Sequence, residues 1–381
     1  MRSFKIQPEV FFGEGSLNHL EEIPQKRILI VTDPFIANGS MLDLITAPLR
    51  RGGADFEIFS DVVPDAPIDK IVLGVKACLA YKPQAIVAVG GGSAIDSAKA
   101  IRHFALCAEN YGTVRLIAIP TTSGTGSEVT SFAVVNDTEE KIKYPLVADY
   151  LTADEAILDA ELVKSVPPSV TADTGMDVFT HALEAYVSSD HNEFASALAE
   201  KAIEICGVFL LRAFLDGQDT HARNKMHVAS CLAGMAFNSA SLGLNHGMAH
   251  QLGAQFHIPH GRANAMLLPH IIEYNADIHK DSRSRSQYEP CVKRYATLAH
   301  TLGLSSYNKV MSVRSLIQWV QFMLKDMNIP EHISYLGTIS IDEYMSKLDA
   351  MADAALEDSC TATNPRTPTK EEIIGIYRRL W

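Results

Sequence analysis

Two domains of different class are predicted from the sequence, an α/β domain built on a parallel sheet and, after it, an all-helical domain. The first 165 residues alternate short apolar runs, rich in Val and Ile, with helical patterns. The two prolines of "SVPPSV" (165–170) interrupt this pattern. At 381 residues the chain is also too long for one ordinary core. We therefore expect domains at 1–165 and 166–381.

The strands of the first domain are expected to be buried on both faces, because their apolar runs are nearly continuous. They are expected at 27–33, 54–60, 85–92 and 114–120, with helices at 41–53, 69–82 and 94–106. After Val134 the pattern becomes more β-like, through "KIKYPLVAD" (141–149) and "EAILD" (155–159). Since strands and helices alternate, the sheet should be parallel.

The second domain is expected to contain helices and no strand. Four segments rich in Ala, Leu, Met and Glu have helical patterns, at 177–187, 195–215, 224–237 and 263–276. A further helix is expected within 363–381. Asp190, followed three residues later by Glu193, predicts a capping box for the second of these helices. We expect a cleft between this domain and the first.

The charge and composition of the chain argue against several kinds of partner. The formal net charge is −12, and no basic tract compensates for it locally, so neither nucleic acid nor an anionic membrane is expected to bind. The chain has no run of about 18 apolar residues and no apolar signal segment at its start. None of the six cysteines lies in a CxxC pair, so we expect buried, reduced thiols of a cytoplasmic protein.

Two loops that follow predicted strands are suited to bind a nucleotide. "GGGSAIDSAKA" opens a helix, where backbone N–H groups and the helix dipole favour phosphate. "PTTSGTGSEVT" (120–130) groups hydroxyls that can bind a sugar, a phosphate or a carboxamide. Parallel strands end at one edge of the sheet, which is where such sheets bind nucleotides. Each loop taken alone can equally be a tight or polar turn. The residues concerned are Gly91, Gly92 and Ser93 in the first loop, and Thr121, Thr122 and Thr125 in the second.

Asp33 ends the first predicted strand. A carboxylate there can accept hydrogen bonds from an adenosine ribose, and it would repel a 2′-phosphate. It can equally cap the following helix.

A group of histidines lies among small and apolar residues, which favours a metal site in a dry pocket. Asp177 and His181 are four residues apart, as are His246 and His250, and each pair shares one face of a helix. His260 follows Pro259, which should open a new helix. One carboxylate with two or three imidazoles suits Fe²⁺ or Zn²⁺, with a position left for a substrate oxygen. The alternative is a set of hydrogen-bonded core histidines. We assign that ordinary role to His257 and His270, and also to Glu184, which could equally support a ligating histidine.

Four motifs together resemble the iron-containing alcohol dehydrogenase family, over essentially the whole chain. They are "GGGSAIDSAKA", "PTTSGTGSE", "GMDVFTHALEAYVS" and "GLNHGMAHQLGAQFHIPHGRANAMLLPHI". The resemblance implies a Rossmann-like first domain within a dehydroquinate synthase-like architecture. Within the family, "KYPL", "ALAEKA" and "HQLGAQFHIPHG" are most similar to the propanol dehydrogenases of bacterial microcompartments.

The resemblance also implies which residues bind what. It assigns the metal, Fe²⁺ with Zn²⁺ able to replace it, to Asp177, His181, His246 and His260. It makes His250 an active-site histidine that is not a ligand. It assigns NAD(H) contacts to Asp33, Gly91, Gly92, Ser93, Thr121, Thr122, Thr125 and Lys143.

The implied reaction is the interconversion of a short-chain aldehyde and a primary alcohol, propanal and 1-propanol, with NAD(H). A polyol dehydrogenase acting on glycerol or propanediol is the main alternative. A dehydroquinate synthase-like lyase would need several Lys and Arg near the metal to bind its anionic substrate, and only Arg262 lies close in sequence to a ligand. A silent metal-binding scaffold would leave both nucleotide loops unexplained. The resemblance further implies a homodimer or higher homo-oligomer, and association with a microcompartment as cargo or at its shell.

Overall fold

The computed structural model describes residues 4–108, 112–138, 142–278 and 288–381, and it gives no side-chain description for residues 142 and 143. The chain divides into two compact units, Met1–Ser165 and Val166–Trp381. Each unit is described by itself. No helix among the described residues is long and apolar enough to cross a membrane.

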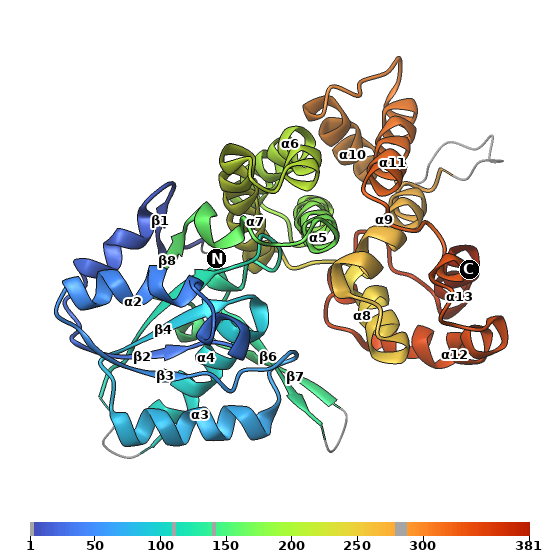
Figure 1. The fold of residues 1–381 in the computed structure, drawn as a ribbon. Helices are drawn as coiled ribbons and strands as arrows, with labels where there is room; N and C mark the ends of the chain where they lie inside the picture. Colours follow the sequence, from blue (N-terminus) through green and yellow to red (C-terminus); the bar gives the residue numbers. More distant parts are fainter. Residues whose placement is uncertain (1–3, 109–111, 139–141, 279–287) are drawn as a thin grey trace. The chain divides into compact units, whose positions relative to one another are not determined.

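The first unit is built on a six-stranded sheet in which every pairing is parallel, as predicted (Figure 1). Its strand order is β1-β8-β5-β4-β2-β3. The predicted strands are confirmed as β2 (Arg27–Val31), β3 (Asp55–Phe59), β4 (Ala85–Gly90), β5 (Arg115–Pro120) and β8 (Glu155–Leu158). The sequence did not predict β1 (Glu9–Phe12), which lies at one edge. The β-like segment 141–149 forms β7 (Ile142–Val147), which pairs with β6 (Phe132–Asp137) in a separate antiparallel hairpin.

Helices cover both faces of this sheet because successive strand residues point to opposite sides. On one face, Leu29, Ile86 and Leu116 pack with residues of α3 (Ile68–Tyr81) and α4 (Gly92–Leu106). On the other face, Ile30, Val87 and Ile117 pack with α1 (Pro34–Ala37), α2 (Met41–Arg51) and the 3₁₀ turn η1 (Ser16–Glu21). Burial on both sides explains why these strands have continuous apolar sequences.

The sheet has a switch point between β2 and β4. Strand β2 pairs with β3 on one side and with β4 on the other, so the connections leaving β2 and β4 diverge at their carboxyl ends. Open α/β sheets bind ligands at such a point. The segments that leave β2 and β4 here begin with Asp33 and with the loop Gly91–Gly92, which are the predicted nucleotide-binding residues.

The second unit is helical, and none of its described residues lies in a strand. The predicted helices are confirmed within α5 (Pro168–Val187), α6 (Glu193–Leu215), α7 (Thr220–Ala240), α9 (His260–Ala276) and α13 (Lys370–Leu380). The histidine spacing is borne out by α8 (Leu244–Phe256). The sequence did not predict α10 (Glu289–Thr301), α11 (Lys309–Asp326) and α12 (Ile341–Glu357), which complete the unit.

Two local predictions were wrong. The cap of α6 is Asn192, whose side chain accepts a hydrogen bond from the Ala195 N–H at 2.9 Å, so Asp190 lies too early in the chain to form the predicted box. A capping box does occur at α13, between Thr369 and Glu372. All six cysteines are free, as expected, but Cys107 is exposed at the end of α4 rather than buried.

Candidate metal centre and nucleotide-binding loops

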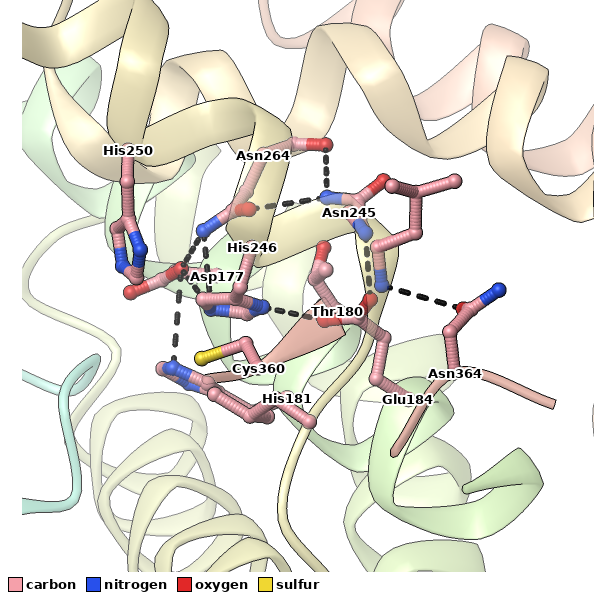
Figure 2. Close-up of polar contacts among 12 residues, drawn as sticks. Asp177, Thr180, His181, Glu184, Asn245, His246, His250, Asn264, Cys360 and Asn364 are labelled. Atoms are coloured by element: carbon pink, nitrogen blue, oxygen red, sulfur yellow. Dashed lines mark hydrogen bonds and ion pairs between the residues drawn. The ribbon is translucent and has the colours of Figure 1, made fainter. Parts of the chain in front are cut away.

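Four donor side chains from three helices converge in the second unit. Figure 2 shows three of them, Asp177, His181 and His246, close together. Asp177 and His181 come from α5, His246 from α8 and His260 from α9. The Nε2 atoms of His181, His246 and His260 lie 4.0, 3.7 and 3.6 Å from Oδ1 of Asp177. The first three side chains are buried, whereas that of His260 is 43% exposed. The cluster is therefore enclosed on most sides and accessible beside His260.

The approach of α9 to α5 depends on a glycine. A Cβ atom on Gly261 would lie 2.1 Å from the carbonyl oxygen of Asp173, so a larger residue would push the two helices apart. Pro259 caps α9 and sets its first residue, His260, beside this contact. The close helix packing therefore brings His260 to Asp177, one turn after Asp173.

The start of α8 is capped by distant side chains rather than by its own residues. The N-cap is Gly243, which has no capping side chain. Instead, Oδ1 of Asn364 accepts from the Leu244 N–H at 3.1 Å, and Oε1 of Glu184 accepts from the Asn245 N–H at 2.7 Å. A carboxylate at a helix start is favourable for the helix dipole. These contacts fix the turn that carries His246.

Glu184 also orients His246. Its Oε2 atom accepts a short hydrogen bond from Nδ1 of His246, whose Nε2 atom points toward Asp177. A carboxylate in this place is the usual partner of a ligating histidine. The sequence left two roles open for Glu184. The structure favours the one in which Glu184 orients a proposed metal ligand, His246.

Sequence analysis missed Asn264, a fully buried residue of α9 at the centre of the cluster. Its Nδ2 donates to Oδ1 of Asp177 at 2.8 Å and lies 3.0 Å from Nε2 of His246 (Figure 2). Asn245, also fully buried, donates to Oδ1 of Asn264 at 2.9 Å and so fixes the orientation of its amide. The only signal in the sequence was an asparagine in an otherwise apolar stretch, "ANAMLL".

The electrostatics of the cluster suit a cation. Burial opposes ionisation of Asp177, but the imidazoles of His181, His260 and His246 hold its pKa well below the usual range. Burial alone would lower the pKa of His246, yet the Glu184 and Asp177 carboxylates raise it to about 9. Burial lowers the pKa of His260, whose ring is therefore neutral. The cluster thus contains an ionised carboxylate, that of Asp177, surrounded by imidazole nitrogens, and a cation can bind to both kinds of donor.

The residues present fit a divalent ion. One carboxylate oxygen and three imidazole nitrogens lie within 4.8 Å of one another. Donors about 2.1 Å from a shared tetrahedral ion are roughly 3.4 Å apart. The separations from Asp177 Oδ1, 3.6 to 4.0 Å, are slightly wider, so small side-chain movements suffice. This donor set, without a thiolate, suits Fe²⁺ or Zn²⁺.

His250 lies beside the cluster but is not one of the four donors. Its ring stacks on that of His260, with centroids 5.4 Å apart and planes 17° from parallel. Its Nδ1 atom is 2.8 Å from Oδ2 of Asp358. His257 ends α8 in a left-handed conformation, and neither it nor His270 belongs to the cluster.

The predicted nucleotide-binding residues of the first unit gather at the switch point. Gly90 has a φ of 150°, and a Cβ there would lie 2.5 Å from Cβ of Ala94. The same position is 3.7 Å from Oδ2 of Asp33, so β4 and the end of β2 are adjacent. Oδ1 of Asp33 accepts from the Ile36 N–H at 3.0 Å, so this residue does cap α1. The cap uses one carboxylate oxygen and leaves the other facing the glycine loop.

The start of α4 offers backbone N–H groups, because its N-cap, Gly91, makes no side-chain cap. Gly92 packs on residues 120–130, the threonine loop, since a Cβ on Gly92 would lie 2.9 Å from Cγ2 of Thr125. Thr122 is adjacent, with Oγ1 3.5 Å from the equivalent position on Gly91. The Thr121 N–H donates to the carbonyl of Gly90 at 3.0 Å. The two loops therefore form one continuous surface.

For two other residues predicted to contact NAD(H), Ser93 and Lys143, the structure shows a contact within the protein or describes only the backbone. The hydroxyl of Ser93 accepts from the Asp65 N–H at 3.1 Å, so it is already engaged within the protein. Lys143 pairs through its backbone with Asn136 in the β6–β7 hairpin. Its side chain lies outside the described residues.

A buried lysine of α4, which sequence analysis did not single out, connects this helix to the threonine loop. Nζ of Lys99, which is 0% exposed, donates to the carbonyls of Thr130 at 2.8 Å and Phe132 at 2.7 Å. Asp96, one turn earlier, accepts from the Ser127 hydroxyl at 2.6 Å. Burial lowers the pKa of Lys99 to about 8. Helix α4 therefore fixes both loops at once.

The fold and the donor cluster together define a class, a two-domain metal-dependent oxidoreductase, and comparison with known proteins gives the family. Residues 7–160 match the family "Iron-containing alcohol dehydrogenase". Residues 171–381 match "Fe-containing alcohol dehydrogenase family, C-terminal". The chain belongs to the iron-containing alcohol dehydrogenase family, which confirms the family and the oxidoreductase class expected from the sequence.

Two curated relatives are similar over nearly the full chain. The 1-propanol dehydrogenase PduQ of Salmonella typhimurium is 42% identical, with 100% of both chains covered. The NADPH-dependent butanol dehydrogenase of Clostridium saccharobutylicum is 37% identical, with 99% of this chain and 97% of the relative covered.

Solved structures support the same fold. A 1,3-propanediol oxidoreductase superposes with a TM-score of 0.90 at 31% identity, covering 100% of both chains. A sulfoacetaldehyde reductase from Bifidobacterium kashiwanohense, solved in complex with NAD⁺, has a TM-score of 0.86 at 25% identity, covering 100% of this chain and 98% of the other. The predicted dehydroquinate synthase-like architecture is thus confirmed.

Proposed function

We propose that this alcohol dehydrogenase interconverts propanal and 1-propanol with NAD(H), using Fe²⁺ held by Asp177, His181, His246 and His260. The observation that carries the proposal is the convergence of one carboxylate and three imidazoles beside an accessible fourth histidine, His250. A divalent ion held there supplies a Lewis acid for the substrate oxygen, and a nicotinamide supplies the hydride acceptor or donor.

The residues of the chain have separable tasks. Asp177, His181, His246 and His260 bind the ion, with Glu184 and Asn264 orienting His246 and Asp177. His250, with its side chain 40% exposed, takes the hydroxyl proton when the alcohol is oxidised and returns it when the aldehyde is reduced.

The preference for NAD(H) rests on Asp33. Its free carboxylate oxygen faces the glycine loop at the switch point, where an adenosine ribose lies if the diphosphate binds at the start of α4. A negative charge at that place binds ribose hydroxyls and repels a 2′-phosphate. The structural relative solved with NAD⁺ supports this choice. The NADPH-dependent butanol dehydrogenase shows that related chains differ in this respect, which makes the cofactor worth a direct test.

The substrate is proposed from the relatives. The similarity to a 1-propanol dehydrogenase favours propanal. The structural likeness to a 1,3-propanediol oxidoreductase favours a diol as the second candidate. The lyase alternative is not retained. Arg262, the basic residue close in sequence to the proposed ligand His260, pairs through two nitrogens with Asp173 at 3.1 Å each, so it is not available to bind a phosphate.

The test is a substrate comparison on anaerobically prepared, iron-loaded protein. In the oxidative direction with NAD⁺, 1-propanol should be turned over with a higher kcat/KM than 1,3-propanediol or glycerol. In the reductive direction, propanal should be turned over with NADH. A preference for either polyol over 1-propanol would replace the proposed substrate. Absence of turnover with every alcohol and aldehyde would overturn the proposal.

Cytoplasmic residence remains a prediction from the cysteine pattern. A homodimer or larger homo-oligomer and association with a microcompartment remain predictions from the family resemblance. Size-exclusion chromatography with light scattering tests the oligomer. Fractionation of cells that produce microcompartments tests the location.

A further inference from the structure

A second carboxylate–imidazole pair lies beside the proposed metal centre. Nδ1 of His250 is 2.8 Å from Oδ2 of Asp358, a residue 108 positions later in the chain. The carboxylate side chain is 15% exposed and the imidazole 40%. The two residues belong to different elements, since Asp358 follows the end of α12 and His250 lies in the middle of α8.

Asp358 is held firmly in this place. Its Oδ1 atom accepts from the Cys360 N–H at 2.9 Å, and the Thr361 hydroxyl donates to the carbonyl of Ala355 at 2.7 Å. These contacts close the turn that follows α12. Both oxygens of the carboxylate are therefore committed, one to the turn and one to His250.

The turn can approach α8 only because Gly247 has no side chain. A Cβ there would lie 2.1 Å from Oγ1 of Thr361 and 3.5 Å from Cβ of Asp358. Gly247 lies directly after His246 and three residues before His250. Helix α8 thus carries His246, a proposed ligand, and His250 one turn later. The turn that contains Asp358 packs on the helix backbone at Gly247, between these two histidines.

An ionised carboxylate accepts hydrogen bonds and cannot donate them. The contact with Asp358 therefore places the proton of a neutral His250 on Nδ1 and leaves the lone pair on Nε2. The ring plane is fixed as well, because His250 stacks on His260. Tautomer and orientation are both set before any substrate binds.

We propose that Asp358 is a positioning residue for proton transfer: it fixes the tautomer and the ring orientation of His250, so that Nε2 faces the reacting oxygen. The inference rests on the proposed function and adds a residue to it. Asp358 acts through His250 and does not itself touch the metal or the substrate.

A double-mutant cycle tests the inference. Asp358→Asn should lower kcat for propanal reduction by about 10- to 100-fold, with little change in KM, metal content or Tm. In a His250→Gln background, the same substitution should lower kcat by less than about 2-fold, because its target is gone. Losses that multiply in the double variant would overturn the proposal. Asp358→Ser, which keeps an acceptor for the Cys360 N–H, separates loss of the histidine contact from loss of the turn.

Asp216→Asn is the matched control. Oδ1 of Asp216 accepts from the Gln218 N–H at 2.9 Å, the same turn geometry, in the connection between α6 and α7. This variant should keep wild-type kcat. A comparable loss of kcat in it would show that the effect belongs to the turn type and not to His250.

Nitrogen NMR of zinc-loaded, histidine-labelled protein gives a readout that does not depend on turnover. His250, assigned by its absence in His250→Gln, should show a protonated Nδ1 in the wild type, and Asp358→Asn should shift the ring toward the other tautomer. An unchanged tautomer would overturn the inference. If propanal is not a substrate at all, the proposed function fails while the NMR result still decides the role of Asp358.

Discussion

The carboxylate of Glu184 joins the start of helix α8 to the ring of His246, one oxygen accepting from the Asn245 N–H and the other from Nδ1 of the imidazole. One buried side chain therefore fixes both the helix turn and the tautomer of a proposed ligand. Replacing this carboxylate with a neutral group should weaken metal binding more than it lowers the stability of the fold.

Glu184→Gln should weaken metal affinity by about 10- to 100-fold, because a neutral amide orients His246 less strongly and makes Nε2 less basic. Competition between the protein and a chelator for Zn²⁺ measures the change. Glu204→Gln is the control, since Glu204 is an exposed residue of α6 paired with Lys201 at 2.8 Å. Equal affinities in the wild type and the Glu184 variant would contradict the proposed orientation.

Protein stripped of its metal should lose stability as the pH rises. Burial lowers the pKa of His246, but the Glu184 and Asp177 carboxylates outweigh it and raise the value from 6.5 to about 9. Because the folded pKa lies above the unfolded one, the contribution to stability is fully present below about pH 6.5 and is lost as the pH rises through about 9. The Tm of the stripped protein should fall across this range, and His246→Gln should flatten the fall. A Tm of the stripped wild type that does not change between these values would refute the prediction.

His246→Ala and His250→Ala should fail in different ways. The first removes a proposed ligand, so metal content and turnover should fall together. The second should keep the metal while turnover falls on the order of 10²-fold or more, because only proton transfer is impaired. Metal analysis alongside initial rates separates the two. If His250→Ala loses its metal as fully as His246→Ala, the division of roles is wrong.

The activity should depend on Fe²⁺ and should be labile to oxygen. The donor set accepts either Fe²⁺ or Zn²⁺, and zinc is the tighter binder, so the ion present depends on supply. Samples loaded anaerobically with each ion, verified by elemental analysis, should differ in kcat. Full activity in a zinc-only sample would refute the assignment of iron.

Asp33→Ser should weaken the preference for NAD(H). Serine can still cap α1 in place of the contact to the Ile36 N–H, so stability should hold while the negative charge is lost. Relative kcat/KM for NADPH against NADH should rise by on the order of 10²-fold. Asp219→Ser, which alters the cap of α7, is the control. An unchanged cofactor ratio would mean that Asp33 serves only as a cap.

The sheet and the spacing of the proposed metal ligands could be predicted from local sequence patterns, because each depends on burial or periodicity within a single strand or helix. Strands such as β4 (Ala85–Gly90) are buried on both faces, so their sequence is apolar throughout. The pairs Asp177/His181 and His246/His250 depend only on the periodicity of one helix. Edge strand β1 was missed because it is short and half-exposed. Helix α12 was missed although its buried Tyr344, Leu348 and Met351 follow a regular helical spacing.

The supporting residues of the centre could not be predicted in this way, because their roles arise from tertiary contacts. Glu184 and His246 are 62 residues apart, and Asp177 and Asn264 are 87 apart. Nothing local distinguishes Asn264 from an ordinary buried amide, and Asp358 resembles any turn residue. Similarly, the cap of α8 is supplied by Asn364, whereas the sequence beside Gly243 offers no cap.

The position of Asn364 in the chain decides when the cap of α8 can form during synthesis of the protein. All four proposed ligands have been synthesised once residue 260 is added, yet Asn364 follows Leu244 by 120 residues. A growing chain that ends before this residue has the donors and the Glu184 contact to the Asn245 N–H, but it lacks the Asn364 contact to the Leu244 N–H. Helix starts without caps fray, and domains assemble only when their packing partners have been made. Iron should therefore bind with full affinity only after Asn364 has been made and has packed against the start of α8.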